Sequence, residues 1–140
     1  MRLIVVEDDP AIRTLMRWFL EAFGVEVELV DSGEATVDAM ERGWPDVIIL
    51  DWFLQGEDGR SVLGRIQERF NMAPPVLVLS GALDAERQME GLPRSVFVSK
   101  PFRVGEFLAA LSELTGDASW IWMTDETVDE KDVARGIKVA

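Results

Sequence analysis

The chain has 140 residues, the length of a typical single domain, and 48 % of them are hydrophobic, which is enough to build a buried core. It contains no cysteine and no histidine, which excludes disulfides, thiolate and imidazole metal sites, and catalysis by either group. Acidic residues outnumber basic ones by 26 to 14, for a net charge of −12, and no basic stripe matches nucleic-acid phosphates. We therefore expect no direct DNA binding, and chemistry that uses carboxylates, hydroxyls, lysine or arginine.

The hydrophobic residues form only short runs. None approaches the roughly 20 residues that a membrane-spanning helix requires. The N-terminal stretch MRLIVVEDDP places acids directly after a very short apolar run, unlike a secretory signal peptide. We expect a soluble cytoplasmic protein without a membrane segment.

Short apolar runs alternate with amphipathic stretches along the first half of the chain. Asp9 and Pro10 are typical of a helix start, and the apolar residues after them recur at steps of three and four. Gly24 is suited to end that helix. The predicted elements are a buried strand over 3–6, a helix over 10–23, an edge strand over 25–30, a helix over 32–43 and a buried strand over 47–50.

The second half of the chain continues this alternation. The predicted elements are a helix over 62–70, a buried strand over 76–79, a short polar helix over 84–90 before Pro93, a strand over 96–98 and a helix over 104–114. Strict alternation of strands and helices predicts an α/β fold, a doubly wound five-stranded parallel sheet with helices on both faces.

Polar residues follow the buried strands, at the edge where the carboxyl ends of parallel strands meet and ligands bind. A single acid at such a place often only caps the next helix, and we expect Asp9 to do so. Five other polar residues follow the strands in this way, and a purely structural role for all of them is much harder to accept. They therefore favour a functional site and are Glu7, Asp8, Asp51, Ser80 and Lys100.

This set has the chemistry of phosphoryl transfer. Two carboxylates about 5 Å apart repel by roughly 3 kcal/mol at an effective dielectric constant of 20, and Mg²⁺ relieves such repulsion. Lys100 supplies a point charge for a phosphoryl oxygen, and Ser80 supplies a hydroxyl donor. A carboxylate is also an accepted phosphoryl acceptor, and Asp51 is the best-centred candidate.

The motifs IVVEDD, IILDWFLQGEDG, VLVLSGA and VSKPF together resemble the receiver domain of two-component response regulators, the CheY-like family, over residues 1–115. The resemblance implies the flavodoxin-like strand order 2-1-3-4-5 and a phospho-accepting regulatory domain that catalyses only its own phosphorylation and dephosphorylation. It also implies Mg²⁺ as the cofactor, a sensor histidine kinase or phosphotransfer protein as the partner that supplies the phosphoryl group, and a downstream protein as the target.

The resemblance also implies roles for individual residues of the metal site. Glu7 and Asp8 take the place of the acidic pair that holds Mg²⁺, with Asp8 the more direct ligand. Asp51 takes the place of the phospho-acceptor and also contacts the metal. The backbone carbonyl of Phe53 completes the protein ligands.

Three further positions match the family pattern around the acceptor. Ser80 resembles the hydroxyl that turns toward the phosphoryl group, and Lys100 resembles the lysine that pairs with the acceptor. The Lys100–Pro101 bond is often cis in this family. Phe97 takes the place of the aromatic switch residue, but it lacks a hydroxyl, so we expect switching by packing alone.

The sequence also departs from the family pattern in the loop after Asp51 and in the segment between Ser80 and Lys100. Gln55 stands where proline is usual, which removes a rigid turn, and bulky Phe53 is expected to slow dephosphorylation by limiting access of water. The interval between Ser80 and Lys100 is short and contains Pro93, so the fourth helix should be short or irregular. The surface that members of this family usually use for output and dimer formation is therefore in question. Whether the protein forms a homodimer is left open.

We expect residues 116–140 to form a C-terminal extension of the receiver domain. Trp120 and Trp122 would be a liability if both were exposed. The segment could cover the domain, dock or dimerise with a partner, or be the remnant of a linker.

Two other functions compete with a receiver. An aspartate-based Mg²⁺-dependent phosphatase usually needs a second acid two residues after the nucleophile, where this chain has Phe53. A pseudo-receiver would use the same fold for binding without taking phosphate, and the complete set of acids, hydroxyl and lysine argues against it. A nucleotide-binding fold is weaker still, because no glycine-rich loop follows the first strand.

Overall fold

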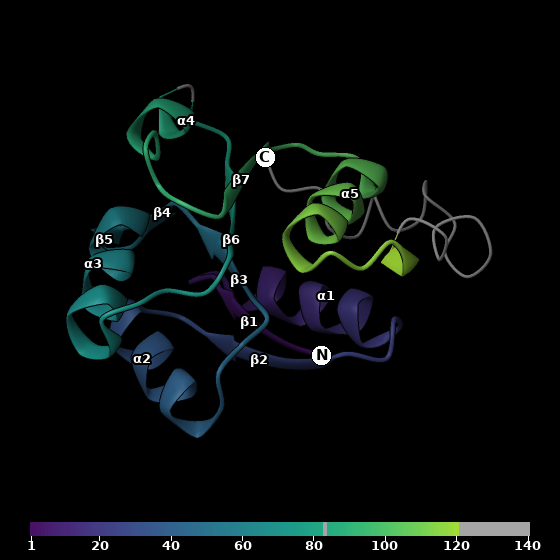
Figure 1. Ribbon diagram of the computed structural model, residues 1–140. Coiled ribbons are helices and arrows are strands. Elements are labelled where there is room, and N and C mark those ends of the chain that lie inside the picture. The colour runs from purple at the N-terminus through teal and green to yellow at the C-terminus, as the bar shows by residue number, and fades with distance from the viewer. Residues whose placement is uncertain (83, 121–140) are drawn as a thin grey trace.

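The computed structural model describes residues 1–82 and 84–120. Within them, helices alternate with the five strands of the main sheet as the sequence predicts, and a short pair of further strands follows the third of these (Figure 1). The strands are β1 (Arg2–Val6), β2 (Glu26–Val30), β3 (Val47–Asp51), β4 (Phe53–Leu54), β5 (Glu57–Asp58), β6 (Val76–Ser80) and β7 (Ser95–Ser99). The helices are α1 (Pro10–Glu21), α2 (Gly33–Arg42), α3 (Gly59–Phe70), α4 (Ala85–Gln88) and α5 (Val104–Thr115).

Five of the strands form one parallel sheet in the order β2-β1-β3-β6-β7. Numbered among themselves, these strands have the order 2-1-3-4-5, so the predicted flavodoxin-like topology is confirmed. The three central strands are buried almost throughout because helices cover both faces, which explains their continuous apolar runs.

The sheet separates two apolar cores. Alternate residues of β1 point to opposite faces, so Leu3 and Val5 pack with α1 and α5, whereas Ile4 and Val6 pack with α2, α3 and α4. Figure 1 shows this division, with α1 and α5 on one side of the sheet. The strands are therefore held from both faces, and their carboxyl ends are rigid supports for side chains.

The predicted helix start at Asp9 is confirmed. Its side chain accepts a hydrogen bond from the Ala11 amide at 2.9 Å, and Pro10 occupies the first turn. Helix α3 begins in the same way, with Asp58 capping the Ser61 amide at 2.9 Å. Both helices therefore start at fixed positions beside the carboxyl edge of the sheet.

The fourth helix is short, as expected. Helix α4 has only four residues, and no side chain caps its N-terminus. The segment between α4 and β7 continues in turns around Pro93, and Arg94 adopts a left-handed conformation with φ of 52°. The helix predicted over 84–90 is thus present but shorter.

The short antiparallel pair β4–β5 does not follow from the sequence pattern alone. Gln55 and Gly56 connect its strands, and Gly56 has a φ of +86°, a conformation that glycine adopts without steric cost. The segment after Asp51 is thus a tight hairpin, although it lacks the proline that is usual in the family.

Beyond α5, Trp120 lies within the expected C-terminal extension and is only 3 % exposed. Its ring packs against Phe23 with centroids 5.6 Å apart. The rest of that extension, including Trp122, lies outside the described residues. No helix among the described residues is long and apolar enough to span a membrane.

Candidate functional site

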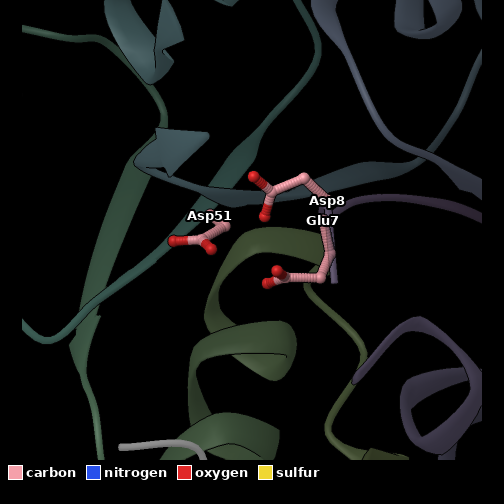
Figure 2. Close-up of side chains that lie close together, drawn as sticks. All are labelled: Glu7, Asp8 and Asp51. Atoms are coloured by element: carbon pink, nitrogen blue, oxygen red, sulfur yellow. The ribbon is translucent and has the colours of Figure 1, made fainter. Parts of the chain in front are cut away.

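Three carboxylates meet at the carboxyl edge of the sheet. Glu7 and Asp8 directly follow β1, and Asp51 is the last residue of β3, its neighbour in the sheet. One carboxylate oxygen from each lies within 4.8 Å of the others. Figure 2 shows the three side chains close together. The sequence-predicted acids are therefore brought together in space.

Lys100 reaches this cluster from the end of β7. Its Nζ lies 3.4 Å from Asp51 Oδ2 and 3.8 Å from Glu7 Oε2. The Lys100 amide donates to the Ser80 carbonyl at 2.9 Å, and the Lys100–Pro101 bond is cis, as the resemblance implies. The lysine side chain is largely buried, so its attraction to the carboxylates is weakly screened by solvent.

Glu7 carries the most informative electrostatic signature of the cluster. Burial raises its pKa to about 8, and a hydrogen bond and charge repulsion from Asp51 act in the same direction. The Asp9 amide, which donates to Glu7 Oε1 at 3.1 Å, and the charge of Lys100 partly oppose the shift. Burial and the neighbouring Asp51 therefore favour the protonated form of Glu7 more than in a free glutamate.

Asp8 is oriented by the hairpin that follows Asp51. Its Oδ2 accepts a hydrogen bond of 2.6 Å from the backbone amide of Gln55. Proline at position 55 would have no N–H to donate, so the departure from the family pattern supplies this bond. The sequence reasoning identified Gln55 as a lost turn and missed its amide as a donor to the acidic cluster.

Ser80 ends the strand next to β3 on the other side. It is buried, and its hydroxyl oxygen accepts a hydrogen bond from the Ala82 amide at 3.1 Å. Asp51 pairs in register with Leu79, the residue before Ser80. The acceptor and the hydroxyl thus belong to adjacent strand ends, as the topology requires.

The two phenylalanines predicted to contribute occupy different surroundings. Phe53 lies in β4, and 43 % of its surface is exposed. Phe97 lies in the middle of β7, pairs in register with Val78 and packs partly against the core on the α3 side. The role of the Phe53 carbonyl as a metal ligand and of Phe97 as a switch remain predictions.

The residues present fit a hard divalent cation. Carboxylate oxygens are the donors that Mg²⁺ prefers, and three of them converge here. Burial and the charge of Asp51 raise the pKa of Glu7, which is the direction expected where negative charge is concentrated and a cation would be favoured. Glu7, Asp8 and Asp51 would hold the ion.

Comparison with known proteins agrees with this geometry. Residues 3–112 match the response regulator receiver domain family. The phosphate regulon transcriptional regulatory protein PhoB of Rhizobium meliloti is 30 % identical over 116 residues, which cover 81 % of this chain and 51 % of that protein. The chain spans about half the length of the first curated relatives that it matches.

Solved structures show the same fold. The receiver domain of a sensor histidine kinase from Pseudomonas aeruginosa PAO1, with a magnesium ion in its active-site cleft, is 28 % identical with a TM-score of 0.72. That match covers 83 % of this chain and 98 % of the other. The response regulator TrrA from Thermotoga maritima, in complex with Mg²⁺ and beryllium fluoride, is 25 % identical with a TM-score of 0.64, covering 81 % and 97 %. The chain therefore belongs to the receiver domain family of two-component response regulators.

Proposed function

We propose that the chain is a signalling receiver that accepts a phosphoryl group on Asp51. The observation that carries this proposal is the meeting of three carboxylates with the buried ammonium of Lys100, 3.4 Å from Asp51. Phosphoryl transfer depends mainly on positioning and charge stabilisation, and this cluster provides both without a histidine. The sources of the phosphoryl group would be a sensor histidine kinase, a phosphotransfer protein or a small phosphodonor.

Each residue has a defined part in the transfer. A carboxylate oxygen of Asp51 attacks phosphorus as the bond to the donor breaks, and the leaving group keeps the bonding electron pair, which yields an acyl phosphate. Lys100 pairs with the phosphoryl oxygens, and the Ser80 hydroxyl turns to donate to one of them. Mg²⁺, held by Glu7, Asp8 and Asp51 with the Phe53 carbonyl, would offset the negative charge gathered there.

The proposed output is a change in a protein-binding surface. The receiver acts on itself rather than on external substrates, because the position of a second acid–base carboxylate is taken by Phe53. Residues 1–115 would form this unit, and residues 116–140 an extension that covers it or docks a partner. The burial of Trp120 against Phe23 supports packing of the extension's first residues. A downstream protein is the expected target; the absence of direct DNA binding remains a prediction.

Intact-mass measurement tests the proposal. Incubation with Mg²⁺ and acetyl phosphate should add one phosphoryl group, and Asp51→Asn should abolish the adduct. Asp31→Asn, which alters an exposed aspartate after β2, is the matched control and should retain the adduct. No adduct in a folded protein that binds Mg²⁺ would indicate a pseudo-receiver, whereas steady release of phosphate from many esters would indicate a hydrolase.

A further inference from the structure

Trp52, the residue after the proposed acceptor, is fixed in place. It is fully buried, its amide donates to the Leu79 carbonyl at 3.0 Å, and its carbonyl accepts from the Gly59 amide at 2.6 Å. Gly59 also lies directly against the ring, since a Cβ built there would be 2.3 Å from a ring carbon. Trp52 is therefore held by β6 and by the start of α3, and it has little freedom to follow a movement of α4.

The indole of Trp52 is hydrogen-bonded to the last residue of α4. Its Nε1 donates to Gln88 Oε1 at 2.9 Å, which satisfies a polar group that would be costly to bury alone. Gln88 Nε2 donates to Asp84 Oδ2 at 2.9 Å, and the Arg60 guanidinium donates to the Gln88 carbonyl. Gln88, in α4, is thus joined through its side chain to Trp52, the residue between β3 and β4, and through its carbonyl to Arg60 of α3.

Helix α4 depends on such external bonds. Helices of so few residues are unstable by themselves, because forming the first turn fixes many dihedral angles for few hydrogen bonds. No side chain caps α4, and at its entry the Ala82 amide is bonded to the Ser80 hydroxyl. The last residue of α4 is consequently tied to Trp52, which follows Asp51 in the chain. The first residue of α4, Ala85, donates to the Ala82 carbonyl, and the Ala82 amide is tied to Ser80, the residue after the sheet partner of Asp51.

We propose that Gln88 is a positioning residue whose hydrogen bond to Trp52 restrains α4 in the unphosphorylated arrangement. This inference rests on the proposed function. When the Ser80 hydroxyl turns to donate to a phosphoryl oxygen on Asp51, its bond to the Ala82 amide is lost, and the entry to α4 is released. Because Trp52 is fixed, α4 moves only by breaking the bond between Trp52 and Gln88.

Thermodynamic linkage predicts how the bond between Trp52 and Gln88 affects the affinity of Asp51 for a phosphoryl mimic. If loading of Asp51 breaks this bond, then removing the bond beforehand must favour loading by the same factor. Variants without the bond should bind beryllium fluoride, a phosphoryl mimic, about fivefold more tightly in Mg²⁺, at the lower end of ordinary coupling between sites. A hydrogen bond with only a structural role would alter folding stability and leave this affinity unchanged.

A double-mutant cycle provides the test, with beryllium fluoride affinity in saturating Mg²⁺ measured by fluorine NMR. Gln88→Leu removes the acceptor, and Trp52→Phe removes the donor while keeping a ring in the core. Each single variant should bind about fivefold more tightly than wild type, and the double variant should match the singles because all three lack the same bond. Gln67→Leu, the same change on the exposed face of α3, is the control and should bind like wild type.

The outcomes distinguish failure of the proposed role of Gln88 from failure of the proposed function. Unchanged or weaker affinity in the single variants, or additive effects in the double variant, would overturn the role of Gln88. Failure of folded wild-type protein to bind beryllium fluoride would overturn the proposed function together with this inference. If Gln88→Leu does not fold, Trp52→Phe alone decides, since it keeps most of the buried ring.

Discussion

At the scale of single residues, Glu7 would make Mg²⁺ binding at the proposed metal site depend on pH. Its pKa of about 8 means that a proton and a cation compete for one carboxylate at neutral pH. We predict that Mg²⁺ affinity weakens about tenfold for each pH unit below about 8, as expected when one proton must leave. Mg²⁺ titration followed by tryptophan fluorescence at several pH values measures this. Glu7→Gln should bind weakly with little pH dependence, and equal wild-type affinity at about pH 6 and pH 8 would contradict the assignment.

The same pKa gives the sign of the stability effect in metal-free protein. A carboxyl whose pKa is higher in the folded state than in the unfolded state favours folding while it is protonated. This contribution is fully present below the ordinary pKa of 4.5 and is lost as pH rises through about 8. Urea unfolding in the presence of a chelator should therefore show that the wild type loses stability over this range relative to Glu7→Gln.

At the scale of elements, helix α3 contains two glycines, one tightly packed and one with open space around it. Gly59 packs against Trp52 and leaves no room for a Cβ, whereas Gly64 has open space around its Cα. Gly59→Ala should lower the free energy of unfolding by about 1–3 kcal/mol through overpacking. Gly64→Ala, the matched control in the same helix, should raise it by about 0.5–1 kcal/mol through better helix propensity. Urea denaturation measures both, and equal effects would show that the contact with Trp52 is not tight.

The elements also show where sequence reasoning succeeds. The apolar runs of the central strands and the cap at Asp9 predict elements near their observed bounds, because burial and capping leave a direct pattern in the sequence. The hairpin β4–β5 leaves no such pattern, because four strand residues are too few to show alternation. Its turn depends on Gly56 and on a backbone bond from Gln55 to Asp8, which side-chain types do not reveal.

At the scale of the whole molecule, the sheet divides the apolar side chains into two cores, and Trp120 closes one of them. Its ring packs on Phe23 of the α1 side, although it lies beyond α5. Trp120→Ala should lower the free energy of unfolding by about 3 kcal/mol, the usual cost of truncating a buried aromatic ring. Trp18→Ala, at a position 64 % exposed, should change it by less than about 0.5 kcal/mol. Similar effects of the two substitutions in urea denaturation would contradict the packing described for Trp120.

The five-stranded parallel sheet and the meeting of the acids could be predicted from the sequence, because parallel topology brings strand ends to one edge. Glu7, Asp8, Asp51 and Lys100 are close for that reason. The hydrogen bond between Trp52 and Gln88 could not be predicted, since it joins an indole to a side chain of an irregular segment. Long-range side-chain bonds of this kind depend on loop geometry, which no periodicity encodes.

Asp51 itself is proposed to receive the phosphoryl group, and reductive trapping identifies the residue that carries it. Borohydride reduces an aspartyl phosphate to homoserine, so protein treated with Mg²⁺ and acetyl phosphate can be reduced, digested and sequenced by mass spectrometry. Homoserine is predicted at Asp51, in the peptide that contains β3. Homoserine at another aspartate, or none in a folded protein that binds Mg²⁺, would contradict the claim.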